Sequence, residues 1–284
     1  MSNEFTNCVD VPAWCPGCGN FPIRETLIEA LDELKLQPHR VLMCSGIGQA
    51  AKMPHYVRVN GFNGLHGRAL PVALGSRVAN PNLTCIVESG DGDTYGEGGN
   101  HFLHNIRRNP NLAHFVHNNQ VYGLTKGQAS PTSDLGMKTG VQTRGVQSHP
   151  LNPLALALAA GAGFVARGFS GEGDHLKELM KAAIEYRGYA LVDILQPCVT
   201  FNRINTFGWY RERVREIPAD HDPTDLAAAR ALAEKWGDEI PIGVLYRFER
   251  DTFEDSLPGK AGDSSVLGAG PDPNLEHLQD AFRV

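Results

Sequence analysis

Short apolar runs alternate along this chain with segments of helical periodicity, and this alternation leaves few folds open to it. Apolar runs typical of buried strands lie at 40–44, 83–88, 112–117, 163–167 and 189–195. Helical spacing of apolar residues falls between them, at 22–35, 68–79, 97–108, 152–160 and 174–187, and again at 224–236. The alternation predicts an α/β fold with a mostly parallel sheet covered by helices on both faces.

Composition and charge exclude several classes of partner. The 284 residues carry a net charge of −6, with 26 basic and 32 acidic side chains. No basic field is available to attract nucleic acid or an anionic membrane. The first residues lack the basic and apolar regions of a secretory signal, and no apolar stretch approaches the roughly 18 residues of a spanning helix. A cytoplasmic protein without nucleic-acid or membrane partners is expected.

The regular pattern weakens in two places. Residues 123–150 are rich in Gly, Ser, Thr and Gln and lack periodicity, and a long loop of this kind is usually either functional or disordered. After about residue 200 the pattern loosens, and 255–284 reads as an irregular tail. We therefore expect a domain over 1–215 that carries the site. Residues 216–284 would form a C-terminal extension that packs on this domain or on a partner.

Polar residues follow two successive strands where each strand ends. Gly90-Asp91-Gly92-Asp93 comes after one strand, and Asn119 follows the next, with Val121 two residues later. Glycines let a phosphate approach the backbone closely. A carboxylate, an amide oxygen and a backbone carbonyl are ligands that suit magnesium shared with a diphosphate. The alternative is a pair of tight turns that only end two strands.

The same residues resemble the signature of thiamine-diphosphate enzymes, Gly90-Asp91-Gly92 with Asn118-Asn119. The resemblance implies that the side chains of Asp91 and Asn119, with the Val121 carbonyl, bind magnesium. It also implies that Gly92 and Asp93 lie beside the diphosphate.

Longer stretches are similar to the β subunits of 2-oxoacid:ferredoxin oxidoreductases. They are Trp14-Cys15-Pro16-Gly17-Cys18-Gly19, Ser45-Gly46-Ile47-Gly48, Leu65-His66-Gly67-Arg68, Gly98-Gly99-Asn100-His101, Tyr122-Gly123-Leu124-Thr125-Lys126-Gly127-Gln128 with Ser130-Pro131-Thr132, and Gln196-Pro197-Cys198. The resemblance covers roughly residues 12–215. Within the family, the 2-oxoglutarate type matches best, with pyruvate or a branched-chain 2-oxoacid as alternatives.

The resemblance implies oxidative decarboxylation of a 2-oxoacid to an acyl-CoA and CO2. Electrons would pass through a [4Fe–4S] cluster to ferredoxin, and coenzyme A would be the co-substrate. The family places thiamine diphosphate at a subunit interface, where the partner contributes the activating glutamate. The chain is therefore expected to act only with an α subunit, in an α2β2 heterotetramer.

The resemblance also nominates further site residues. His66 and Lys126 are candidate catalytic residues. The alternatives are that His66 is an ordinary loop histidine and that Lys126 is a solvated lysine at the surface. Thr125, Gln128 and Thr132 are weaker candidates. The expected cofactor-binding residues are Ser45, Gly46, Ile47, Gly48, His66, Gly67, Gly90, Asp91, Gly92, Asp93, Asn119, Val121, Gly123, Leu124 and Thr125.

Six cysteines remain to be explained. Cys15 and Cys18 have the two-residue spacing that lets two thiolates bind one metal centre, and Cys198 follows a strand end. The family's third cysteine follows the Gly-Ile-Gly turn, where this chain has Gln49, so we expect Cys44 as the fourth cluster ligand. The alternatives are a cluster bound by three cysteines only, or one in which Cys8 replaces Cys44 as the fourth ligand. Cys85 lies in an apolar run and reads as buried.

Two other functions are each compatible with part of this sequence. A non-oxidative thiamine decarboxylase or carboligase usually has a longer chain and needs no cysteine cluster. A zinc-stabilised interaction subunit would bind zinc through Cys15, Cys18, Cys44 and Cys198, but it would not need Asp91 and Asn119.

Overall fold

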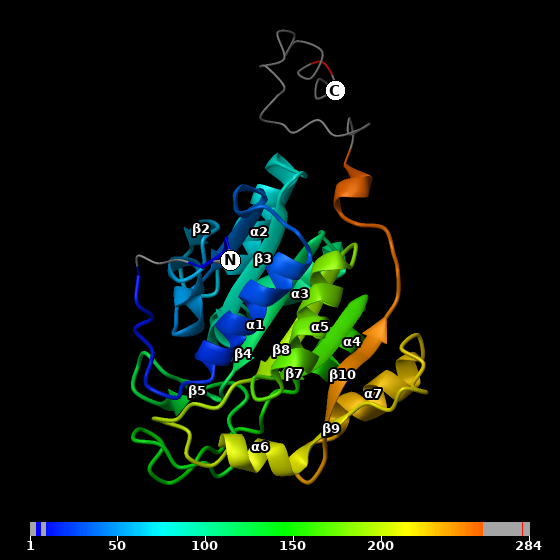
Figure 1. The fold of residues 1–284 in the computed structure, drawn as a ribbon. Coiled ribbons are helices and arrows are strands. Elements are labelled where there is room, and N and C mark those ends of the chain that lie inside the picture. The colour runs from blue at the N-terminus through cyan, green and yellow to red at the C-terminus, as the bar shows by residue number, and fades with distance from the viewer. Residues whose placement is uncertain (1–3, 7–9, 258–279, 281–284) are drawn as a thin grey trace.

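The computed structural model describes residues 4–6, 10–257 and 280. An eight-stranded sheet with the strand order β2-β1-β3-β4-β8-β7-β10-β9 forms its centre (Figure 1). Neighbouring strands run parallel except β10, which is antiparallel to β7. The structure therefore confirms the predicted α/β fold with a mostly parallel sheet.

The strands are β1 (Val41–Ser45), β2 (Asn60–Asn63), β3 (Thr84–Gly90), β4 (Leu112–Asn118), β7 (Phe164–Phe169), β8 (Tyr189–Leu195), β9 (Val214–Glu216) and β10 (Ile240–Arg247), with β5 (Val121–Tyr122) and β6 (Gln128–Ala129) in a separate hairpin. The α-helices are α1 (Asn20–Glu33), α2 (Ala69–Ala79), α3 (Gly99–Arg108), α4 (Pro153–Ala159), α5 (Gly173–Glu185), α6 (Phe207–Arg213) and α7 (Leu226–Glu234). Shorter helical turns are η1 (Pro38–Arg40), η2 (Ala50–His55), η3 (Gly92–Glu97) and η4 (Glu254–Ser256).

Helices cover both faces of the sheet, as the sequence predicts. On one face, α1 and α5 lie side by side and bury Leu27, Leu31 and Met180 against the strands (Figure 1). On the other, α2, α3, α4 and α7 bury a second cluster that includes Phe102 and Leu154. Strands covered on both faces need apolar residues at successive positions, which explains why β4 and β8 are buried along their whole length.

Strand register places the polar motifs at one edge of the sheet. β3 and β4 pair in parallel, with Gly90 opposite His117. Asp91 and Asn118 therefore follow directly at neighbouring strand ends. The long loop after β4 adds the β5–β6 hairpin at the same edge. Ligands of open α/β sheets bind at this carboxyl edge.

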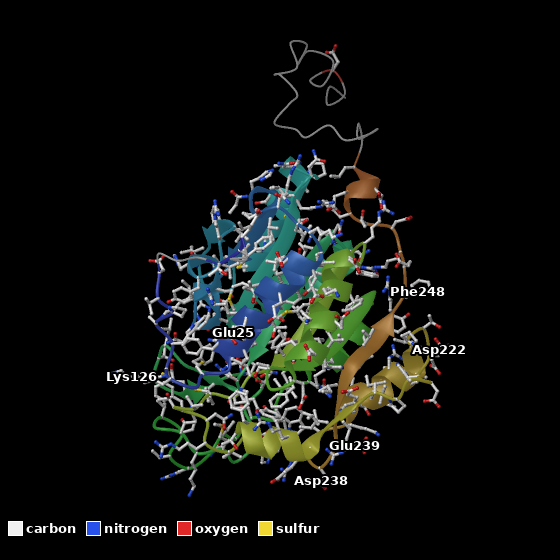
Figure 2. The ribbon with its side chains drawn as sticks, viewed as in Figure 1. Glu25, Lys126, Asp222, Asp238, Glu239 and Phe248 are labelled. Carbon is white, nitrogen blue, oxygen red and sulfur yellow. The ribbon has the colours of Figure 1, made fainter. Side chains whose placement is uncertain are left out.

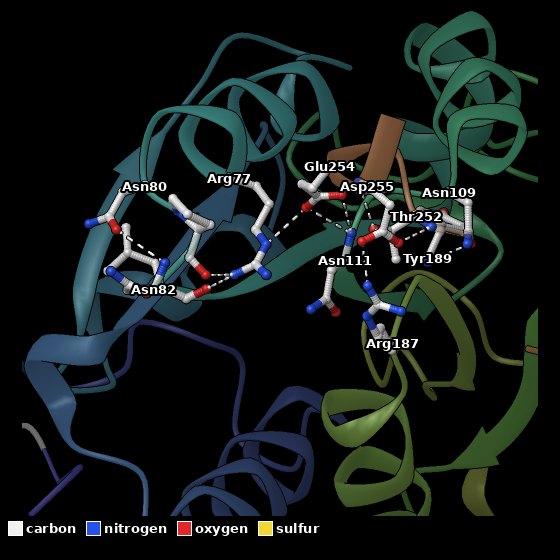
Figure 3. Close-up of polar contacts among 12 residues, drawn as sticks. Arg77, Asn80, Asn82, Asn109, Asn111, Arg187, Tyr189, Thr252, Glu254 and Asp255 are labelled. Atoms are coloured by element: carbon white, nitrogen blue, oxygen red, sulfur yellow. Dashed lines mark hydrogen bonds and ion pairs between the residues drawn. The ribbon is translucent and has the colours of Figure 1, made fainter. Parts of the chain in front are cut away.

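The chain after residue 200 is more regular than the sequence indicates. β10 pairs with β7 in the sheet. The segment that follows it leads to the end of the sheet opposite the carboxyl edge, where Glu254 and Asp255 bind the loops that precede the strands (Figure 3). Glu254 pairs with Arg77 at 2.9 Å and accepts from the backbone N–H of Asn111, while Asp255 pairs with Arg187. The division at 215/216 remains a prediction, and most of the expected tail lies outside the described residues.

None of the helices in the described part of the chain combines the length and the apolar character that crossing a bilayer requires.

Candidate functional site

One pocket gathers most of the predicted cofactor residues. Its wall comes from the turn after β1, the Gly90–Asp93 turn after β3, and the segment from Asn119 to Thr125 after β4. Asp91 and Asn119 both line it, as their positions at neighbouring strand ends predict. The Asn119 amide oxygen accepts from the backbone N–H of Val121 at 3.0 Å, which fixes the turn.

Asp91 is a buried carboxylate with no basic side chain paired to it in the described part of the chain. Its exposed fraction is 1%, and its Oδ2 accepts hydrogen bonds from the hydroxyls of Ser130 and Thr132. Within the described residues, no Lys, Arg or His forms an ion pair with it. Burial raises its pKa to about 6, although the two hydroxyl hydrogen bonds lower it. A divalent cation would remove the cost of this unpaired charge, so the residues fit a magnesium site.

Asp93 holds two loops in place. Its Oδ1 accepts from the backbone N–H groups of Ile47 at 2.9 Å and Gly67 at 2.8 Å. His66 Nδ1 lies 2.7 Å from the same oxygen. A Cβ at Gly46 would lie 2.1 Å from the other carboxylate oxygen, so only glycine fits there. Asp93 therefore shapes the wall of the pocket through the loops that it binds.

The predicted site residues separate into two groups. The pocket is lined by Ile47, Gly48, His66, Gly90, Asp91, Gly92, Asp93, Asn119, Val121, Gly123, Leu124 and Thr125. Ser45, Gly46 and Gly67 are not among the lining residues. Lys126 is exposed and lies at the edge of the molecule, outside the lining (Figure 2). Its predicted catalytic role gains no support from this position.

Sequence reasoning missed a buried polar chain beside the pocket. His117 lines the pocket, and its Nε2 lies 2.7 Å from Glu88 Oε2 while its Nδ1 lies 2.7 Å from Asn20 Oδ1. Burial raises the pKa of Glu88, which is fully buried. The sequence did contain a signal for this polar chain, because Glu88 and His117 are polar residues within two otherwise apolar strands.

A second missed network supports Asp91 from behind. The Thr132 hydroxyl donates to Asp91 at 2.6 Å and lies 2.9 Å from the Asn118 amide oxygen, and the Asn118 amide nitrogen donates to Asp193. Tyr95 also donates to Asp193 at 2.7 Å. These contacts join strand ends, η3 and the long loop, so they position Asp91 rigidly.

Three cysteines meet in an adjoining pocket. Cys15, Cys18 and Cys198 line it, together with Gln49 and Asn119. Phe201 N–H donates to Cys198 Sγ at 3.4 Å, and Gln196 Nε2 donates to Cys18 Sγ at 3.6 Å. Burial raises the pKa of Cys18 to about 11. The structure thus brings together three of the four predicted cluster cysteines.

Cys44 is not among them. Successive side chains of a strand point to opposite faces. Met43 packs in the cluster under α1 and α5, and Cys44 packs, fully buried, in the cluster on the other face. Burial raises its pKa to about 12, with a smaller contribution from Cys85. This position argues against the predicted role of Cys44 as the fourth ligand. Cys8 lies outside the described residues.

The fold and the pocket define a thiamine-diphosphate-binding domain. Residues 43–194 match the family model of the C-terminal TPP-binding domain of thiamine pyrophosphate enzymes. Residues 198–261 match the C-terminal family model of the pyruvate ferredoxin oxidoreductase β subunit.

Relatives that align over most of the chain identify the family within this class. The 2-oxoacid:ferredoxin oxidoreductase subunit β of Saccharolobus solfataricus is 46% identical over 260 residues, which cover 86% of this chain and 85% of that protein. The 2-oxoglutarate synthase subunit KorB of Methanocaldococcus jannaschii is 31% identical over 86% of this chain and 90% of that protein. A solved 2-oxoglutarate:ferredoxin oxidoreductase from Magnetococcus marinus, with 2-oxoglutarate, coenzyme A and succinyl-CoA bound, superposes with a TM-score of 0.91 at 38% identity. The superposition covers 99% of this chain and 95% of the Magnetococcus chain.

The chain belongs to the β subunits of 2-oxoacid:ferredoxin oxidoreductases. It is thus a subunit of an oxidoreductase and contains the thiamine-diphosphate-binding domain.

Proposed function

We propose that this β subunit, with an α subunit in an α2β2 heterotetramer, oxidises 2-oxoglutarate to succinyl-CoA and CO2 and reduces ferredoxin. The names of the Methanocaldococcus and Magnetococcus proteins support 2-oxoglutarate over pyruvate or a branched-chain acid. The bound molecules of the Magnetococcus structure support coenzyme A as co-substrate. A cytoplasmic location without membrane or nucleic-acid partners remains the expectation from the sequence.

The observation that carries the proposal is the buried Asp91, which pairs with no basic side chain of the described residues and lies in the same pocket as Asn119. The side chains of Asp91 and Asn119 and the Val121 carbonyl would bind magnesium, and the glycine turns would leave room for the diphosphate. Thiamine diphosphate, when bound, supplies the carbanion chemistry of the reaction. The protein residues orient it, and Ser130 and Thr132 hold Asp91 in position.

His66 is proposed as the residue that faces the reacting groups. It lines the pocket, is about one-third exposed, and has its Nδ1 2.7 Å from an oxygen of the Asp93 carboxylate. With Nδ1 beside Asp93, Nε2 would be the nitrogen that hydrogen-bonds a diphosphate or a substrate. Lys126 remains a weaker candidate, because its loop would have to fold over the pocket.

Asp91→Asn tests the metal site with almost no change in volume. We expect thiamine diphosphate affinity to fall by roughly 100-fold or more, since even an outer-shell partner typically contributes about 10–100-fold. Cofactor content of the purified assembly and a magnesium–thiamine diphosphate titration measure the change. Asp222→Asn, an exposed aspartate remote from the pocket (Figure 2), serves as control. Unchanged affinity in Asp91→Asn would refute the site.

Substrate choice needs a separate measurement. We expect the assembled enzyme, with ferredoxin and coenzyme A, to show its highest kcat/KM with 2-oxoglutarate. A higher value with pyruvate or a branched-chain 2-oxoacid would reject the proposed substrate and leave the cofactor site untouched.

A further inference from the structure

We propose that this chain holds an iron–sulfur cluster with only three thiolates, from Cys15, Cys18 and Cys198, and that the amide of Gln49 faces the fourth iron. The inference rests on the proposed redox function and specifies the metal centre. It also predicts how this centre differs from one bound by four cysteines.

The three cysteines come from distant parts of the chain, yet they line one pocket. Cys15 and Cys18 lie in the turn before α1, and Cys198 follows β8. Gly19 N–H donates to the Pro197 carbonyl at 3.2 Å, which joins the two segments. Two of the sulfurs accept N–H hydrogen bonds, from Phe201 and Gln196, and such bonds are among the factors that tune cluster thiolates.

Gln49 is fixed at the wall of this pocket. Trp14 Nε1 donates to its backbone carbonyl at 2.8 Å, and Gly123 leaves room for its side chain. Its amide oxygen is buried and has no hydrogen-bond partner. Gln49 also lines the neighbouring pocket that contains Asp91, so it stands between the two.

Two further polar atoms of the same wall lack partners, the side-chain oxygen of Gln196 and the amide nitrogen of Asn20. Native proteins satisfy nearly all of their buried polar groups. Three such atoms around one small space indicate a pocket built for a polar occupant, beside three thiols that bind soft metals.

A single ion does not fit these donors. Zinc requires its thiolates at about 2.3 Å. In the described residues, no three His, Cys, Asp or Glu side chains are gathered closely enough to hold one ion. The cysteines of a cluster bind different irons and so can stand further apart. Cys44 cannot complete a four-cysteine set from the opposite face of the sheet.

A neutral amide oxygen is a poorer ligand than thiolate for iron bound to sulfide. The fourth iron would therefore exchange its ligand readily and leave on mild oxidation. In that step [4Fe–4S]²⁺ gives one electron to added ferricyanide and releases Fe²⁺, which leaves [3Fe–4S]⁺. The sulfide and the three thiolates stay in place.

The test uses the assembled enzyme, purified anaerobically and treated with stoichiometric ferricyanide. We expect the wild-type protein to develop the EPR signal of a three-iron cluster and to release one iron per β subunit. Gln49→Cys should keep its iron and give no such signal, whereas Gln49→Ala should behave like the wild type. Cys44→Ser should also match the wild type, and Cys15→Ser should lower the iron content.

A wild-type cluster that resists oxidation as Gln49→Cys does would overturn the inference, since a fourth thiolate from Cys8 or the partner would then be present. Iron content unchanged in Cys15→Ser would place the cluster elsewhere. Thiamine diphosphate content, measured on the same samples, reports the proposed function independently. A failure of that function is thereby distinguished from a failure of the three-thiolate site.

Discussion

At the scale of single residues, the polar groups inside the sheet matter most. Asp91, Glu88, His114 and Asp193 are each almost fully buried in strands or at their ends. Burial raises the pKa of the three carboxyls and lowers that of the histidine. In each case the neutral form is favoured, so these groups couple protonation to folding or to the arrival of a cation.

His114 should make stability depend on pH. Burial lowers its pKa from 6.5 to about 3 in the folded chain, whereas the unfolded chain keeps the ordinary value. Between these values the unfolded state binds the extra proton, so stability is full at pH 7 and falls as the pH drops. Relative to His114→Gln, the wild-type chain should lose about 2 kcal/mol more unfolding free energy between pH 7 and pH 5.

Urea unfolding of the purified chain at the two pH values measures this difference. His149→Gln, at an exposed histidine, should leave the pH dependence of the wild type unaltered. Equal pH slopes for the wild type and His114→Gln would show that His114 titrates normally.

At the scale of elements, the carboxyl edge of the sheet depends on turns held by side chains. One backbone hydrogen bond, from Gly64 N–H to the Ser45 carbonyl at 2.7 Å, joins the segment before α2 to the end of β1. The turns that follow them also donate backbone N–H groups to the same carboxylate, that of Asp93. A change in either turn should therefore reach the pocket through Asp93.

Gly46→Ala tests this dependence. The added Cβ would lie 2.1 Å and 2.5 Å from the two Asp93 oxygens, so the carboxylate must move and release Ile47 or Gly67. We expect thiamine diphosphate affinity to fall by roughly tenfold or more, as for other supporting contacts of a metal site. A calorimetric titration measures it.

Gly75→Ala is the matched control. No atom lies within 4 Å of a Cβ at this exposed position of α2, and alanine favours a helix over glycine by about 1 kcal/mol. Stability should rise slightly and affinity should not change. Equal affinities in the two variants would show that the β1 turn does not shape the pocket.

At the scale of the whole molecule, exposed apolar residues border the site. Leu65, next to His66, is 76% exposed, and Leu124, in the wall of the pocket, is 47% exposed. Exposed apolar side chains that gather beside a functional pocket often mark an interface. We therefore expect the partner subunit to contact this side of the chain.

Leu65→Glu should weaken assembly, because the interface would have to bury an unpaired carboxylate. Co-expression with the α subunit, followed by size-exclusion chromatography, should show more free β subunit than in the wild type. Phe248→Glu, at a comparably exposed residue on the other side of the molecule (Figure 2), should assemble normally. Normal assembly of Leu65→Glu would place the partner elsewhere.

The sequence by itself determined the alternation of strands and helices, and with it the meeting of Asp91 and Asn119. Periodicity is a local property, and consecutive strands of a βαβ unit usually pair. The bounds of β3, β4 and α3 therefore agree closely with the expected ranges. The resemblance of the motifs to a family was also local, and the relatives confirmed it.

Only the tertiary structure decided which side chains meet across long separations. Strand register sets the face to which a residue points, and a shift of one residue would reverse it. That is why Cys44 could be expected at the cluster and yet lies on the opposite face of the sheet. Nor could the sequence show Ser130 and Thr132 on Asp91, or Gln49 among three cysteines, because long-range packing has no local signature.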